Sequence, residues 1–149
     1  MWQASLAQAE LAPGQRDLLA NFGDEIFAAA ESENVDIGFE ASVGGTIPVI
    51  KTIKESLAAN RIKSIFGIMN GTSNYILSKM TDEGKAFGAV LKEAQELGFA
   101  EADPTNDIEG IDTAHKLAIT LALSYGKRVK LEDIYREGIS RIEKQDIEF

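Results

Sequence analysis

The chain of 149 residues contains no cysteine and only one histidine. The lack of cysteine excludes disulfide bonds, thiolate metal sites and cysteine nucleophiles, and it favours a cytoplasmic protein. With His115 as the single imidazole, we expect no zinc site. No apolar run approaches the roughly 20 residues of a membrane-spanning helix. Residues 1–12 lack the basic start of a signal peptide, so we expect no membrane partner.

Basic side chains are also scarce. Fifteen of them face twenty-four acidic ones, which gives a formal net charge of −9. A surface of this sign repels phosphate backbones, so we expect no nucleic-acid partner. Hydrophobic residues make up 44% and charged residues 26%, the usual balance of a soluble globular domain. The sequence therefore predicts one domain over residues 16–149, after a disordered or artificially added lead-in over residues 1–15.

The apolar residues follow two periods. Spacing of three and four residues predicts helices over 16–33, 46–60, 72–80, 82–98, 112–125 and 131–136. Alternation of apolar and polar residues predicts strands over 35–43, 61–69 and 138–142. Helices that alternate with a few strands favour an α/β or α+β fold, in which a small mixed β-sheet packs against helices on one face.

An unusual group of ionisable residues lies between two of these helices. It consists of Glu101, Asp103, Asp107, Glu109, Asp112 and Lys116. Asp112 and Lys116 are four residues apart, so on a helix they lie on the same face. One interpretation is a solvated loop with an ordinary ion pair on a helix. The other is a binding site, because carboxylates crowd together where a metal, a lysine or a substrate ammonium group binds them. The spacing of a calcium-binding EF-hand loop is absent.

A second candidate site is the turn at residues 70–74, where a predicted strand leads into a predicted helix. Backbone N–H groups at the start of a helix favour an anion such as a carboxylate or a phosphate. The alternative is an ordinary helix cap made by Thr72 or Ser73. The sequence pattern leaves both interpretations open.

Residues 96–104 and 106–116 together resemble the signature of homoserine dehydrogenases. The signature combines Gly98, an aromatic residue, Glu101, Asp103-Pro104, Asp107, Gly110, Asp112 and Lys116 at fixed spacing. Residues 39–48 resemble the first strand and turn of the catalytic domain of that family, and residues 68–77 resemble its active-site loop. The resemblance extends from about residue 18 to residue 149.

The resemblance implies an activity and a role for each site residue. The family interconverts L-aspartate 4-semialdehyde and L-homoserine with NAD(P)H, in the biosynthesis of threonine, methionine and isoleucine. Lys116 would be the catalytic acid and base, held by Asp112. The substrate would be bound by Glu101, Asp107, Phe99 and Thr72, and the nicotinamide cofactor would be approached by Asn70, Gly71, Thr72 and Ser73. A monovalent cation such as sodium would be held, mostly by backbone carbonyls, at Glu40, Val43, Gly45 and Ile47. The free face of the sheet would form a homodimer.

The chain also departs from the family pattern. It contains no GxGxxG motif, so NAD(P) would bind through a nucleotide-binding domain outside this sequence. A lysine that the family places before the first helix corresponds to Arg16, and an arginine cannot exchange protons near neutral pH. Because hydride transfer needs a hydride carrier, we expect the chain by itself to be inactive. The alternative function is that of a non-catalytic dimeric binding module.

Overall fold

The computed structural model describes the backbone of residues 13–149 and the side chains from Leu18 onward. Of the predicted lead-in, residues 1–12 lie outside the described residues, and residues 13–15 begin the first helix. The side chain of Arg16 also lies outside the described part. The chain divides into two compact units. Unit 1 comprises the residues up to 65 together with 115–134, and unit 2 comprises 66–114 and 135–149. The prediction of one domain over 16–149 stays a prediction, because compactness does not show whether the units fold separately.

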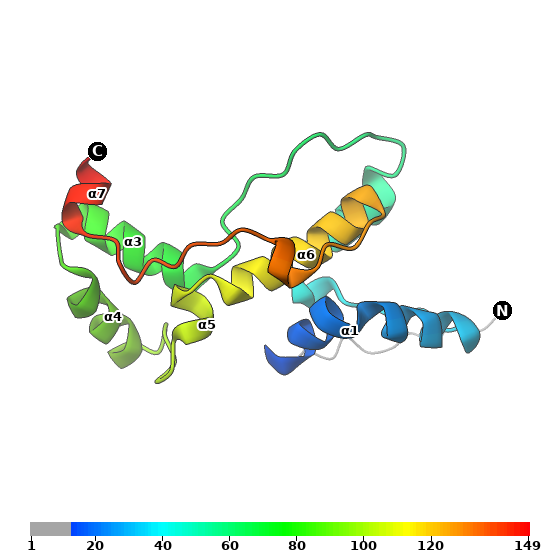
Figure 1. The fold of residues 1–149 in the computed structure, drawn as a ribbon, viewed down its shortest axis with the longest axis horizontal. Coiled ribbons are helices and arrows are strands. Elements are labelled where there is room, and N and C mark those ends of the chain that lie inside the picture. Colours follow the sequence, from blue (N-terminus) through cyan, green and yellow to red (C-terminus); the bar gives the residue numbers. More distant parts are fainter. Residues whose placement is uncertain (1–12) are drawn as a thin grey trace. The chain divides into compact units, whose positions relative to one another are not determined.

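The predicted β-sheet is wrong. Every regular element between residues 13 and 149 is a helix, and Figure 1 shows coiled ribbons without arrows. The α/β (α+β) fold class and a dimer interface on a sheet face are therefore not supported. A strand is stable only when its N–H and C=O groups bond to a neighbouring strand. Alternation in the sequence indicates that one side of a segment is apolar, but it does not supply that neighbour.

Two of the predicted strands are replaced by turns. In the first, the backbone N–H and the hydroxyl of Ser42 both donate to the carbonyl of Phe39, at 3.0 and 2.6 Å, and a 3₁₀ turn forms. This turn buries Phe39 and Val43 together. In the last, the N–H of Ile142 donates to the carbonyl of Ile139 at 3.1 Å. The chain thus turns where an alternating pattern predicted that it would stay extended.

The predicted strand over 61–69 has no regular structure. Two of its apolar side chains are exposed, Phe66 to 93% and Ile68 to 77%, and the other three are only partly buried. No other segment of residues 13–149 pairs with it as a strand. The segment keeps the amphipathic pattern of a strand without a partner to complete it.

Unit 1 contains helix α1 (Pro13–Ser32), the 3₁₀ turn η1 (Glu40–Ser42), helix α2 (Val49–Lys51), the π-helix η2 (Thr52–Ser56), most of helix α6 (Ile111–Tyr125) and the 3₁₀ turn η3 (Leu131–Asp133). The helix predicted over 16–33 is confirmed by α1, and that over 112–125 by α6. The helix predicted over 46–60 starts later and changes to a π-helix, and only a 3₁₀ turn forms within 131–136. The core of unit 1 consists of Leu19, Phe39, Val43, Ile50 and Ile119.

Unit 2 contains helices α3 (Gly71–Glu83), α4 (Phe87–Glu96), α5 (Thr105–Ile108) and α7 (Lys144–Glu148), together with the first residues of α6. Helices α3 and α4 pack against each other, and α7 also contacts α3 (Figure 1). Their shared core consists of Ile76, Met80, Val90, Ala94 and Ala100. The predicted helix over 72–80 is confirmed but runs on to Glu83, so the next helix starts only at Phe87. The acidic stretch, for which no helix was predicted, contains α5.

Candidate functional site

The site in unit 2 is organised around Asn70, the residue before helix α3. Its side-chain oxygen accepts a hydrogen bond from the N–H of Ser73 at 2.8 Å and thereby caps the helix. Its Nδ2 donates to Asp107 Oδ1 at 2.6 Å and to Asp112 Oδ2 at 2.9 Å. Asn70 is buried, with 7% of its surface exposed. Two carboxylates that are far from Asn70 in the sequence therefore meet at one amide group.

Two further hydrogen bonds attach the acidic stretch to helix α3. The hydroxyl of Ser73 donates to the carbonyl of Asp107 at 3.0 Å, and the hydroxyl of Thr72 donates to the carbonyl of Phe99 at 2.8 Å. The ring of Phe99 lies against that of Tyr75, with 4.8 Å between the ring centroids. The predicted substrate residues Asp107, Phe99 and Thr72 are thus brought together, although the helix cap comes from Asn70 and not from Thr72 or Ser73.

The polar network that supports Tyr75 was not predicted from the sequence. The Tyr75 hydroxyl donates to Glu93 Oε1 at 3.0 Å, and the Lys85 ammonium group donates to Glu93 Oε2 at 2.8 Å. Glu83 is bonded to Lys79 and Lys85. The i, i+4 spacing of Lys79 and Glu83 was visible in the sequence, but the contact between helices α3 and α4 was not.

These contacts displace several pKa values. Hydrogen bonds from Lys79 and Lys85 lower the pKa of Glu83 to about 2. Hydrogen bonds from Lys85 and then Tyr75 also lower the pKa of Glu93. Burial, followed by the bond to Glu93, raises the pKa of Tyr75. The network therefore holds both carboxylates in the charged form over the physiological pH range.

The remaining acidic residues of the cluster have other surroundings. Asp103 accepts hydrogen bonds from the hydroxyl and the N–H of Thr105, at 2.6 and 3.1 Å, and these bonds lower its pKa. Asp103 thus shapes the entry into α5. Glu101 is exposed, and its backbone carbonyl accepts a bond from Gln95 at 3.1 Å. The side chain of Glu101 is not part of the group that meets at Asn70.

Lys116 lies on helix α6, in the portion that belongs to unit 1. The hydroxyl of Thr120 donates to the carbonyl of Lys116 at 2.7 Å. The helix is continuous from Ile111 to Tyr125, so Asp112 and Lys116 are separated by about one turn, as the sequence predicted. The neighbours Ala118 and Ile119 are buried.

The residues predicted to hold a monovalent cation lie in unit 1. The two carboxylate oxygens of Glu40 accept hydrogen bonds from the N–H groups of Ile50 and Lys51, at 2.8 and 2.9 Å. The side chain of Glu40 therefore stabilises the short helix α2, and its geometry does not fit an open cation ligand. Val43 is buried, while Gly45 and Ile47 are exposed in the turn that follows. The cation site stays a prediction from the resemblance.

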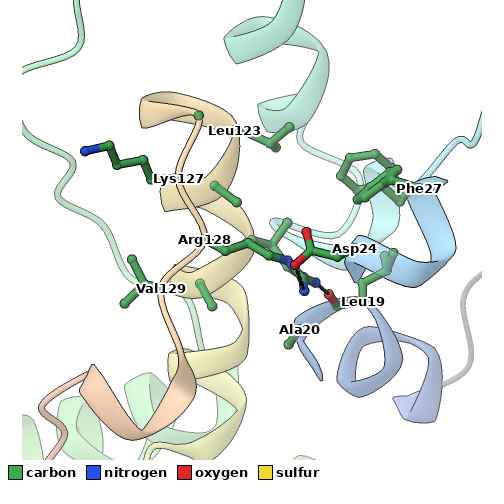
Figure 2. A pocket seen from close by; sticks show the side chains of 13 residues that line it. Leu19, Ala20, Asp24, Phe27, Leu123, Lys127, Arg128 and Val129 are labelled. Atoms are coloured by element: carbon green, nitrogen blue, oxygen red, sulfur yellow. Dashed lines mark hydrogen bonds and ion pairs between the residues drawn. The ribbon is translucent and has the colours of Figure 1, made fainter. Parts of the chain in front are cut away.

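Unit 1 also contains a cavity of about 320 Å³, lined mainly by apolar side chains of α1 and α6. Figure 2 shows Arg128 reaching across it to α1. Arg128 donates to the carbonyl of Leu19 at 3.1 Å and pairs with Asp24 at 2.9 Å. Helix α1 bends at Phe22, which leaves the regular helical conformation. A Cβ atom at Gly23 would collide with the guanidinium group of Arg128, so a larger residue there would displace the end of the Arg128 side chain.

None of the helices between residues 13 and 149 is long and apolar enough to span a membrane. Within the same range, no group of three or more histidine, aspartate or glutamate side chains is arranged to hold a metal ion.

Comparison with known proteins shows to which family this chain belongs. Residues 48–149, more than half of the chain, match the family profile described as homoserine dehydrogenase. The chain belongs to the homoserine dehydrogenase family. Among curated homoserine dehydrogenases, that of Neisseria gonorrhoeae is 57% identical over 134 residues, which covers 90% of this chain and 31% of the relative. That of Bacillus subtilis is 51% identical over 134 residues, again 90% of this chain and 31% of the relative.

Solved structures of the family agree with the fold of this chain. The homoserine dehydrogenase of Thiobacillus denitrificans is 56% identical, with a TM-score of 0.85 over 88% of this chain and 30% of that one. A hyperthermophilic archaeal homoserine dehydrogenase mutant, solved in complex with NADPH, is 36% identical, with a TM-score of 0.77 over 85% of this chain and 39% of that one. The chain therefore spans about a third of the length of the relatives that it matches.

Proposed function

We propose that this chain supplies the substrate-binding and catalytic residues of a homoserine dehydrogenase, which interconverts L-aspartate 4-semialdehyde and L-homoserine with NAD(P)H. The reaction belongs to threonine, methionine and isoleucine biosynthesis, a cytoplasmic process. The observation that supports the proposal most strongly is the convergence of Asp107 and Asp112 on Asn70. All three lie in segments that resemble the family.

The chemistry of the substrate explains why carboxylates are gathered here. Homoserine carries a primary ammonium group, and a pair of oriented carboxylates provides the opposite charge and the hydrogen-bond acceptors that it needs. Asp107 would bind this group, with exposed Glu101 reaching it from the neighbouring loop. The loop of Phe99 and Thr72, bonded to α3, would border the substrate.

Lys116 would act at the substrate oxygen. When the aldehyde is reduced, negative charge develops on its oxygen, and a nearby ammonium group stabilises this charge and can donate the proton. In the reverse direction the amine accepts the proton of the alcohol. Asp112, about one turn earlier on α6, would orient Lys116.

The residues around α3 fit a nicotinamide cofactor only in part. The backbone N–H groups of Gly71 and Thr72 lie in the first turn of the helix and are suitable donors, and Gly71 leaves open space where a side chain would be. The amide of Asn70 is already engaged with Ser73 and the two aspartates. NAD(P)H would supply the hydride. The proposed role of residues 71–73 is to border its nicotinamide end, with the rest of the cofactor bound elsewhere.

We also propose that the chain forms a homodimer. The exposed apolar side chains of Phe66 and Ile68 favour self-association, because large apolar groups in water are stabilised by burial. Sedimentation at micromolar concentration should give twice the mass of the chain. A monomer would remove the dimer from the proposal without affecting the reaction.

The activity can be tested in a chimeric enzyme, defined here as the Thiobacillus denitrificans homoserine dehydrogenase with its matching segment replaced by this chain. We expect it to oxidise L-homoserine with NAD⁺ or NADP⁺, and the 149-residue chain alone to show no turnover, since it has no nucleotide-binding motif. A folded but inactive chimera would favour the second candidate, a non-catalytic binding module. Homoserine binding to the chain, measured by NMR, would then be its expected property.

A further inference from the structure

The amide of Asn70 has no donor left for a cofactor. An asparagine side chain carries two N–H donors and one carbonyl acceptor. One donor is used by Asp107 Oδ1, the other by Asp112 Oδ2, and the carbonyl is used by the N–H of Ser73. Since Asn70 is also almost completely buried, it cannot turn outward without breaking all three bonds.

The two aspartates need such a donor. Their bonded oxygens both lie within 2.9 Å of one nitrogen, so two negative charges are held close together. Like charges at this separation repel unless donors lie between them or a cation binds them. The Asn70 amide fixes one oxygen of each carboxylate without adding a charge of its own, whereas an ammonium or guanidinium group at position 70 would add a positive charge.

The backbone at Asp107 is also held in place, by the residue that Asn70 caps. Asp107 lies on the short helix α5, and the hydroxyl of Ser73 fixes its carbonyl at 3.0 Å. Among the described residues, none donates a hydrogen bond to the second side-chain oxygen of Asp107. This oxygen can therefore receive the ammonium group of a substrate once the first is held by Asn70.

We propose that Asn70 is a positioning residue for the substrate: it holds Asp107 and Asp112 in place, so that Asp107 can bind the ammonium group of homoserine, and it does not bind the nicotinamide. This inference rests on the proposed function. It differs from the role that the resemblance implies for Asn70, which is to approach the cofactor.

The chimeric enzyme allows this role to be separated from that of a helix cap. Asn70→Ser keeps a side-chain oxygen that caps α3 but removes both amide donors, whereas Asn70→Ala removes the cap as well. We expect both variants to raise the KM for homoserine at least about tenfold, which corresponds to about 1.4 kcal/mol of binding. The KM for NADP⁺ should change less than about twofold. Asn60→Ser, at an exposed position of unit 1, is the matched control and should leave both constants unchanged.

A double-mutant cycle with Asp107→Asn gives a second readout. If Asn70 acts through Asp107, the effect of Asn70→Ser on the homoserine KM should be several-fold smaller once Asp107 is replaced. Additive effects would overturn the proposal, as would a changed KM for NADP⁺ with an unchanged KM for homoserine. If only Asn70→Ala, and not Asn70→Ser, affects the enzyme, Asn70 is merely a cap. Absence of homoserine oxidation in the unsubstituted chimera would instead contradict the proposed function itself.

Discussion

In unit 2 polar side chains from helices α3, α4, α5 and α6 and from the loops between them bond to one another, whereas in unit 1 they bond largely to backbone groups at helix ends and bends. Asn70 joins Asp107 and Asp112 in unit 2. In unit 1, Glu40 binds two N–H groups of the segment that forms α2, and Arg128 binds the carbonyl of Leu19. Bonds between side chains gather charges from distant parts of the sequence, as a ligand site requires. Bonds to the backbone complete local structure and leave few groups for a ligand.

Replacement of the proposed catalytic lysine should have the largest effect, and it tests whether unit 1 contributes chemistry as well as structure. In the chimeric enzyme Lys116→Met should lower kcat by roughly 10²–10⁴, the usual contribution of a positioned acid and base. Asp112→Asn should reduce kcat less, since it would remove an orienting contact and not the proton donor. Steady-state kinetics and circular dichroism of each variant give the measurement. Equal kcat values for Lys116→Met and the unsubstituted enzyme would mean that Lys116 is only part of a helix ion pair.

Arg128 tests the structural role of polar groups in unit 1. Arg128→Met removes the donor to the Leu19 carbonyl and the partner of Asp24. We therefore expect the free energy of unfolding to fall by about 1–2 kcal/mol. Lys130→Met is the matched control, because its ion pair with Glu132 is exposed at both ends and should contribute less than about 0.5 kcal/mol. Urea unfolding of the 149-residue chain measures both. Equal losses of stability in the two variants would show that the contacts of Arg128 with α1 do not stabilise the fold.

The smallest expected effect is a pH dependence in unit 2. The pKa of Glu83 in the folded chain is about 2, below its ordinary value of 4.5. A carboxyl group with a lowered pKa contributes stability above pH 4.5, and this contribution is lost as the pH falls toward 2. Lys85→Met removes one of the two ammonium groups that lower this pKa, so stability should fall less steeply between these pH values. Urea midpoints measured across the same range provide the test.

Lys92→Met is the control for that measurement. It removes an ammonium group that lies 3.9 Å from Glu96 on exposed positions of α4, outside the network around Glu93. Its acid dependence should match that of the unsubstituted chain. If the urea midpoint of Lys85→Met depended on pH in the same way as that of the unsubstituted chain, solvent would screen the Lys85 contacts completely.

The success of the sequence predictions differed between helices and strands. Helices α1, α3 and α6 were predicted because their hydrogen bonds lie within one segment, so local spacing of apolar residues carries most of the information. The three strands were wrong because strand pairing depends on a second segment that local spacing does not specify. At residues 138–142, predicted as a strand, the chain instead makes a turn, and Ile139 and Ile142 pack on the core of unit 2.

The sequence by itself determined the family, the positions of the main helices and the residues that could carry charge chemistry, because these depend on residue identity and short-range spacing. Only the tertiary structure decided which of those residues meet. Asp107 and Asp112 converge on Asn70, while the side chain of Glu101 stays in solvent and that of Glu40 is used by α2. The physical reason is that a hydrogen bond depends on distances of about 3 Å and on direction, and for residues 37 or 42 positions apart these are fixed by the packing of helices and not by the order of residues.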